Sequence, residues 1–439
     1  MRLLYAFLCL FPTLASAQSS TLSPEALAGR EAMKAAQCNR CHPISDAAQK
    51  GHGLPPAEQA MHCVDCHTWI LGTRGDQKAI EAQRETFPDW DRYLENIVHF
   101  TVLPDLGTLT RRVRPDFVRR YLDGPFDLRP HLDEAMIPVK LTATQKDAVV
   151  AYLTSLNPPL ADPPTKPISP EGIAAGKQAF ITRGCPACHV MGDTPVLPAF
   201  DAAFYGRLKA AAPADFPARL APDLRYVRER IPRDTLVAFI QNPTQVDPKS
   251  RMPNQGVKPQ EAERIADFLL AAQISPLPEA QTVSVDEGQF PVLDRPVTYD
   301  EVFDEVFGFI CVHCHMHPES NNGDGGAGNT GGLGWPGARL DLETYEGMKA
   351  GLKRPGDAQA TDILARGPGG EPPLLWRALL KRHQEASRDV RPPFARGPRL
   401  STPTDGTHPG MPLGLPPLSK RKMQLIRTWL AQGAKGPTP

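Results

Sequence analysis

One five-residue pattern, Cys-x-x-Cys-His, occurs four times in the chain. In each copy the two thiols lie about one helical turn apart, so both can reach vinyl groups on one edge of a porphyrin. The following His can then ligate the iron from below, and the whole pattern is that of a c-type haem attachment site. The attachment cysteines are Cys38, Cys41, Cys63, Cys66, Cys185, Cys188, Cys311 and Cys314, and the axial histidines are His42, His67, His189 and His315.

Paired cysteines also occur in disulfides, zinc sites and thioredoxin-like redox pairs. Zinc would take four Cys or His ligands per site from paired knuckles, and a redox pair would occur once, without an invariable following His. Neither alternative predicts four identical pentapeptides. Eight of the nine cysteines lie in the four copies, and the ninth is Cys9. The sequence therefore predicts four covalently bound haem c groups.

The first 17 residues have the pattern of a secretory signal peptide. Arg2 precedes an apolar run over residues 3–14, and Ala15-Ser16-Ala17 is an A-x-A cleavage sequence. The apolar run is too short for a membrane span, and no other stretch approaches 18 apolar residues. We expect cleavage near Ala17, removal of Cys9 with the peptide, and export of the mature protein to the bacterial periplasm.

Length and composition limit the fold and the partners. A chain of 439 residues predicts about three domains. The formal net charge is zero, so the sequence gives no overall attraction to nucleic acid or to a membrane surface. With 48 prolines, 35 glycines and 7% aromatic residues, we expect short helices joined by long loops, with haem supplying core material.

Two stretches of the chain share one order of elements. A helix begins after an N-cap serine and a proline, Ser23-Pro24 in one stretch and Ser169-Pro170 in the other. In both, a glycine precedes the first cysteine by nine residues. Each stretch then continues with a Pro-Asp-Leu segment, an amphipathic helix, a Met close to a Pro, and a closing helix. The sequence therefore contains an internal repeat.

This order resembles the class I cytochromes c, in which the first and last helices pack across each other and a Met thioether is the distal iron ligand. The resemblance covers nearly all of residues 20–275. It implies Met136 and Met252 as distal ligands. For each of them, a Met that fills a gap in the core is the alternative.

The second copy interrupts the repeat, because 62 residues separate His42 from Pro104 but only 33 separate His189 from Pro222. It looks like an insertion into a class I domain. Its closeness to the first copy in sequence favours a coupled pair of haems. We favour His99, within an apolar segment, as its distal ligand, which would lower its potential. The other candidates are His52, Met61, His62 and His131, and an empty position also fits the sequence.

The fourth copy follows an expected helix over residues 299–310 with an apolar stripe. A Gly-rich tract over residues 321–337, expected to be a flexible loop, precedes an Arg-Leu-Asp segment, Met411-Pro412 and a closing helix over 420–432. This order resembles the planctomycete-type cytochromes c over about residues 298–435. The resemblance implies Met411 as distal ligand, with His408, Met316 and His317 as alternatives.

The predicted fold class is mainly α, with three tandem cytochrome c-like domains and long irregular loops. The expected divisions are a signal peptide (1–17), a dihaem domain (18–157), a Pro-rich linker (158–170), a monohaem domain (171–275), a linker (276–297) and a monohaem domain (298–439).

The predicted function is electron relay, because six-coordinate haems with two protein ligands leave no open position for a substrate. The partners would be redox proteins: a donor dehydrogenase or quinol-oxidising complex, and an acceptor. The alternative is a haem enzyme, peroxidase-like or acting on small sulfur or nitrogen compounds, with an open or weakly ligated second haem. The chain could also be the cytochrome subunit of a larger redox complex.

A run of arginines between the repeat elements has two interpretations. It forms a solvated face, or it contacts haem propionates or an acidic redox partner. The residues are Arg111, Arg112, Arg114, Arg119 and Arg120.

Overall fold

The computed structural model describes most of the chain. The described ranges are 22–44, 63–88, 90–96, 103–126, 128–130, 136–162, 167–191, 217–320, 325–331, 335–389, 410–413 and 415–437. Outside them lie the predicted signal peptide and six candidate ligands: His52, Met61, His62, His99, His131 and His408.

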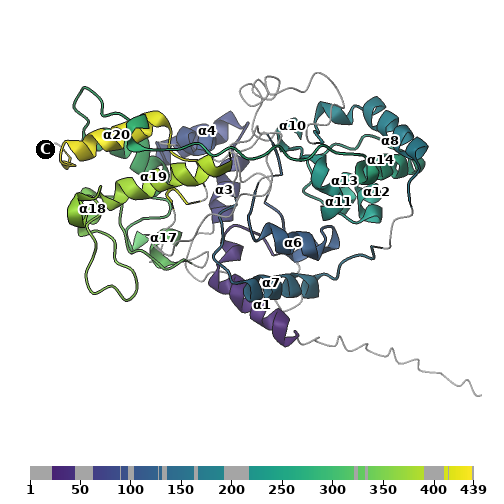
Figure 1. The fold of residues 1–439 in the computed structure, drawn as a ribbon, viewed down its shortest axis with the longest axis horizontal. Coiled ribbons are helices and arrows are strands. Elements are labelled where there is room, and N and C mark those ends of the chain that lie inside the picture. The colour runs from purple at the N-terminus through teal and green to yellow at the C-terminus, as the bar shows by residue number, and fades with distance from the viewer. Residues whose placement is uncertain are drawn as a thin grey trace, which may run out of the picture.

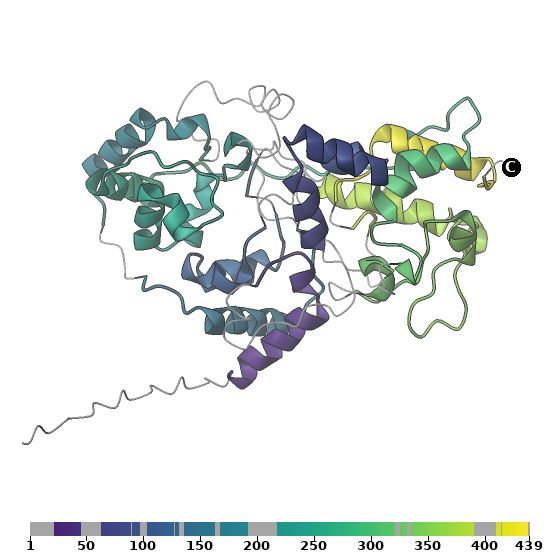
Figure 2. The ribbon, with the colours of Figure 1, turned by 180° about the vertical axis from the view of Figure 1, so that it is seen from behind.

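Within the described ranges the chain is mainly helical and has no strand, which confirms the mainly α class. An isolated antiparallel bridge joins Leu352 to Thr361. Figure 1 shows the helices in three groups, with α3 between them, and Figure 2 shows the same arrangement from behind. No helix in the part of the chain described is long and apolar enough to cross a membrane.

The first group is built on the crossing of α1 (Pro24–Ala35) and α7 (Ala143–Leu156). Both helices begin as the sequence predicts: the Ser23 hydroxyl caps α1, and a capping box of Thr142 and Gln145 starts α7. At the crossing, a Cβ on Gly29 would overlap the carbonyl oxygen of Ala148, so only glycine permits this approach.

The second group repeats this crossing with α8 (Pro170–Thr182) and α14 (Pro259–Ala271). Here Gly176 lies against the carbonyl oxygen of Arg264. Phe180, Ile265 and Phe268 are buried beside the contact and belong to one apolar core. The glycine nine residues before the first cysteine therefore has the same structural reason in both groups: it lets two helix backbones touch.

The third group has no such glycine. Its first helix, α15 (Tyr299–Val302), runs into a π-helix, η7 (Phe303–Cys311), and its last is α20 (Lys420–Ala431). Val302, nine residues before Cys311, is fully buried, and Trp429 of α20 lies edge-on to Phe307 at 6.0 Å between ring centroids. Side chains rather than backbones therefore fill this crossing.

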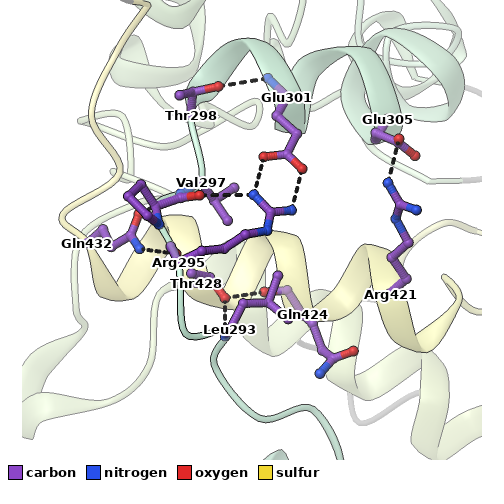
Figure 3. A network of polar contacts seen from close by, with 11 residues as sticks. Leu293, Arg295, Val297, Thr298, Glu301, Glu305, Arg421, Gln424, Thr428 and Gln432 are labelled. Atoms are coloured by element: carbon purple, nitrogen blue, oxygen red, sulfur yellow. Dashed lines mark hydrogen bonds and ion pairs between the residues drawn. The ribbon is translucent and has the colours of Figure 1, made fainter.

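Polar contacts hold the segment before α15 against α20 (Figure 3). The Val297 N–H donates to the Gln432 amide oxygen at 3.0 Å, and the Leu293 N–H donates to the Thr428 hydroxyl at 2.9 Å. Arg295 forms a two-pronged ion pair with Glu301 at the start of the helix. These bonds satisfy backbone groups that no strand or helix pairs.

The inserted segment, residues 63–96, folds into helices that the sequence analysis did not predict. These helices are α3 (Cys63–Gly72), α4 (Gln77–Thr86) and α5 (Trp90–Asn96). Trp90 is buried, stacks edge-on against Trp69 at 4.8 Å between ring centroids, and donates its indole N–H to the Thr73 hydroxyl. The segment thus has a small core of its own.

The remaining helices belong to these groups or connect them. They are η1 (Cys38–Arg40), η3 (Leu106–Arg111), α6 (Pro115–Tyr121), η4 (Cys185–Ala187), α10 (Pro217–Leu220), η5 (Leu224–Tyr226), α11 (Val227–Arg230), α12 (Arg233–Gln241), α13 (Pro243–Val246), η6 (Glu287–Gln289), α17 (Ala327–Thr330), α18 (Tyr345–Ala350), η8 (Pro368–Gly370), α19 (Leu374–Ala386) and η9 (Ser387–Asp389).

We expect Gly176→Ala to destabilise the protein by about 1–3 kcal/mol, because the added methyl group must push α8 away from α14. Gly172→Ala on the same helix is the matched control, since its Cβ would lie 3.3 Å from the Ile168 side chain. Alanine's helix propensity should make the control neutral or slightly stabilising. Urea unfolding of both variants measures the difference, and equal stabilities would contradict the proposed role of the crossing.

Candidate haem-attachment sites

Three of the four pentapeptides adopt one turn. The carbonyl of the first cysteine accepts the N–H of the histidine at 3.0 Å in the first copy, 3.0 Å in the third and 3.1 Å in the fourth. In the first and third copies the preceding residue, Gln37 or Gly184, has a left-handed backbone. This turn ends the entry helix and brings the second cysteine and the histidine back beneath it.

The second copy has a different local structure. Cys63 to His67 lie within α3, which continues to Gly72, and the side chains of Cys63 and Cys66 are outside the described part of the structure. His67 is half-buried, and burial together with the nearby His313 lowers its pKa to about 4. The insertion therefore does not copy the geometry of the repeat that contains it.

The first and third histidines are held by backbone carbonyls. His42 Nδ1 lies 3.1 Å from the Pro104 oxygen, and His189 Nδ1 lies 3.0 Å from the Pro222 oxygen. A carbonyl only accepts, so Nδ1 carries the hydrogen in each ring. Burial lowers the pKa of both histidines and keeps them neutral. Each ring then has its Nε2 lone pair available for iron.

The fourth histidine uses a side chain instead. His315 Nδ1 lies 3.2 Å from the amide oxygen of Asn329, which also accepts the Leu340 N–H at 2.7 Å. The Asn329 amide nitrogen donates to the Met316 carbonyl. Asn329 is buried, and its three bonds join α17 to the pentapeptide and to the segment that follows.

The prediction of a flexible loop is wrong for residues 325–331. This stretch includes α17 and packs on the pentapeptide, because glycines allow it to approach closely. A Cβ on Gly328 would lie 2.6 Å from both the Cys314 oxygen and the His315 ring. Sequence analysis missed Asn329, because the same tract contains the polar residues Asn321, Asn322 and Asp324 and no local signal distinguishes Asn329 from them.

One segment recurs beside the pentapeptide in all three groups. The leucine of each x-Asp-Leu segment donates its N–H to a carbonyl at or just after the histidine, with distances of 2.8–2.9 Å. The aspartate accepts the N–H two residues further on. The three aspartates are Asp105, Asp223 and Asp341. The repeat found in the first two stretches thus extends to the third in structure.

The described thiols are poor nucleophiles. Cys38, Cys185 and Cys311 are free of disulfides, and burial raises the pKa of Cys38 and Cys311 to about 12 and that of Cys185 to about 11. Redox-active cysteines and zinc ligands need the opposite shift, toward the thiolate. The environment therefore does not favour a thioredoxin-like pair.

The candidate distal methionines differ in their surroundings. Met411 is half-buried against the core cluster that also contacts Cys311, and its N–H donates to the Ala378 carbonyl at 2.9 Å. Met136 and Met252 are half-buried and lie outside the clusters described around Cys38 and Cys185. Met411 and Cys311 border one large apolar cluster, and all three methionine ligands stay predictions.

A buried arginine lies near the third pentapeptide. Arg230 Nε is buried and has no hydrogen-bond partner among the described residues. Burial and the nearby Arg129 and Arg112 lower the Arg230 pKa to about 10, and Arg230 in turn lowers the pKa of His189. A guanidinium with an unpaired Nε near the predicted axial histidine suits an anion such as a haem propionate.

The arginines singled out in the sequence have mixed roles. Arg112, Arg114, Arg119 and Arg120 form ion pairs, and their partners are Asp247, Asp162, Asp147 with Asp123, and Glu229, respectively. The ion pairs of Arg112 and Arg120 join the first helix group to the second. At the same contact, the Arg114 backbone N–H donates to the Arg230 carbonyl at 2.8 Å. These pairs favour a structural role at this contact.

Comparisons with protein-family models, curated proteins and solved structures give no match to this chain. Over the described residues, no three His, Cys, Asp or Glu side chains gather to hold a metal ion. At three pentapeptides the structure does show a turn with two cysteines and a buried, neutral imidazole. These groups fit the needs of covalent haem attachment.

We expect Asn329→Leu to cost about 1–3 kcal/mol of stability, because a near-isosteric apolar side chain leaves buried polar partners unpaired. Asn254→Leu is the control, since Asn254 is exposed and its oxygen accepts the Gly256 N–H at the surface. Denaturant unfolding compares the two. A loss that is no larger in Asn329→Leu would show that this amide does not hold the site.

Proposed function

We propose that the protein is a tetrahaem c-type cytochrome that relays electrons between redox proteins in the bacterial periplasm. The observation that carries this proposal is the shared turn, which recurs with a neutral histidine held through Nδ1 at three pentapeptides. Three separate apolar cores each contact the first cysteine of one of these pentapeptides. This supports three tandem cytochrome c-like domains, the first of which carries the inserted second site.

Bound haem would supply a one-electron Fe(III)/Fe(II) couple at each site. The chain's own groups orient and tune it: the cysteines anchor the porphyrin edge, and the Nδ1–H bond fixes the imidazole plane and its basicity. The acceptor is a proline carbonyl in two sites and the Asn329 amide in a third. Different acceptors give the sites different reduction potentials, which a relay needs if electrons are to move in one direction.

The distal ligands in this proposal are Met136, Met252, Met411 and His99. Each would close the sixth position of its iron, so that substrate has no access and the protein acts as a carrier. The donor would be a dehydrogenase or quinol-oxidising complex, and the acceptor a second redox protein.

A second candidate function is a haem enzyme that uses the site of His67. Its support is the distinct geometry there, since this pentapeptide lies within an α-helix that continues to Gly72. An open sixth position at this site would allow reaction with peroxide or with a small sulfur or nitrogen compound. Either function is compatible with a place in a larger redox complex.

We expect the purified protein to carry four haems by pyridine haemochrome assay and intact mass, and Cys185→Ser/Cys188→Ser to carry three. Low-temperature electron paramagnetic resonance (EPR) of the ferric protein should show low-spin signals only, with no rapid carbon monoxide binding after reduction. His99→Ala should convert one signal to high spin. A stoichiometric high-spin haem in the unmodified protein would instead support the enzyme.

Asn329→Asp should lower the midpoint potential of one haem by tens of millivolts. A carboxylate is a stronger acceptor than an amide, so it makes the His315 ring more electron-donating and stabilises Fe(III). Asn254→Asp adds the same charge at an exposed position and should leave all four potentials nearly unchanged. Spectroelectrochemical titration measures both, and equal shifts would contradict a specific effect through His315.

A further inference from the structure

We propose that the second and fourth haem sites are neighbours and exchange electrons directly, although their pentapeptides are far apart in the sequence. This inference rests on the proposed function and adds a spatial order to it. The electron would pass between the inserted segment, residues 63–96, and the C-terminal helix group. One iron is oxidised as the other is reduced, and no bond forms or breaks.

The first observation is an aromatic path between the two sites. His313 lies between the attachment cysteines of the fourth pentapeptide, and its ring meets Tyr93 of α5 edge-on, with 6.5 Å between centroids. Tyr93 meets Trp90 at 6.3 Å, and Trp90 meets Trp69 of α3 at 4.8 Å. The helix that begins with the second pentapeptide is therefore connected by packed rings to the fourth.

The second observation concerns the pentapeptides themselves. Trp69 follows His67 by two residues in α3, and the path of packed rings that begins at Trp69 ends at His313. His67 is the predicted axial ligand of the second haem, and His313 lies within the attachment loop of the fourth. The contact therefore joins two haem-binding motifs, not two remote surfaces.

Because each haem would be attached covalently to its pentapeptide, this contact also limits the distance between the two haems. Two thioether bonds and one axial bond keep a porphyrin within about one side-chain length of its own pentapeptide. Two pentapeptides joined by a short path of packed rings therefore hold neighbouring porphyrins. The second haem then has a neighbour from a distant part of the chain, in addition to any coupling with the first.

An independent contact fastens the C-terminal group to the first repeat. The Trp335 indole N–H lies 3.5 Å from the Pro138 carbonyl, and Lys140 Nζ lies 5.0 Å from the centre of the same ring. Pro138 belongs to the segment that follows Met136. Two separate contacts on the first repeat thus hold the fourth pentapeptide beside the insertion.

Pulsed EPR on the fully oxidised holoprotein tests the pairing through the magnetic dipolar coupling between ferric haems. The Cys63→Ser/Cys66→Ser variant identifies the second haem by the signal that it loses. Removal of the fourth haem, by Cys311→Ser/Cys314→Ser, should abolish the strong coupling between these two sites. Removal of the third, by Cys185→Ser/Cys188→Ser, is the matched control and should leave that coupling intact.

The reciprocal measurement uses the Cys63→Ser/Cys66→Ser variant and follows the coupling of the fourth haem, so the test does not depend on the folding of one variant. Trp90 and Ile70 form a small cluster separate from the three large cores, so loss of the second haem leaves those cores in place. The fourth haem should then lose its coupling to the second. Dipolar couplings of the second haem that are unchanged by removal of the fourth would overturn the pairing, whereas fewer than four haems in the unmodified protein would refute the tetrahaem proposal instead.

Discussion

In the proposed function the pentapeptide histidines bind iron through Nε2, so each must donate its Nδ1 hydrogen to an acceptor. The structure meets this requirement at three sites. In two sites the acceptor is a proline carbonyl 62 or 33 residues downstream of the histidine. The aspartate that follows each proline then starts a short helix by accepting a backbone N–H. The loop between the pentapeptide and the acceptor varies in length, but in both sites it ends at the proline carbonyl that accepts the histidine Nδ1–H.

The C-terminal group meets the same requirement with a side-chain amide instead of a proline carbonyl. There the acceptor belongs to Asn329, which lies only 14 residues after His315 and is carried by a single helical turn. Glycines make this possible, since Gly328 and Gly326 bring the backbone against Cys314. The C-terminal group keeps the x-Asp-Leu segment at Asp341, and its leucine N–H donates to a carbonyl at or just after the histidine, as in the first two groups. It differs in the acceptor of the histidine Nδ1–H.

Local signals in the sequence predicted the helix starts, because a cap depends on residues three or four positions apart. The caps at Ser23, Ser169 and Thr142 all form. The close glycine crossings follow the repeat that the sequence also displays. The role of Asn329 could not be predicted in this way, because it depends on contacts with Leu340 and the pentapeptide. The helices of the insertion pack on one another, and α4 begins at an Asp76 cap that the sequence analysis did not use.

The crossing of α1 with α7 explains how the first repeat tolerates a second attachment site within it. Gly29 fixes the crossing through backbone contact with Ala148, and the histidine fixes the return point at Pro104, so the chain between His42 and Pro104 is a loop with anchored ends. The insertion nearly doubles that loop relative to its counterpart in the second repeat. Doubling a loop costs only about 0.6 kcal/mol of closure entropy, far less than the anchoring contacts contribute. In the proposed function, a repeat of this kind can therefore gain a second haem site by lengthening one loop, at a small cost in closure entropy.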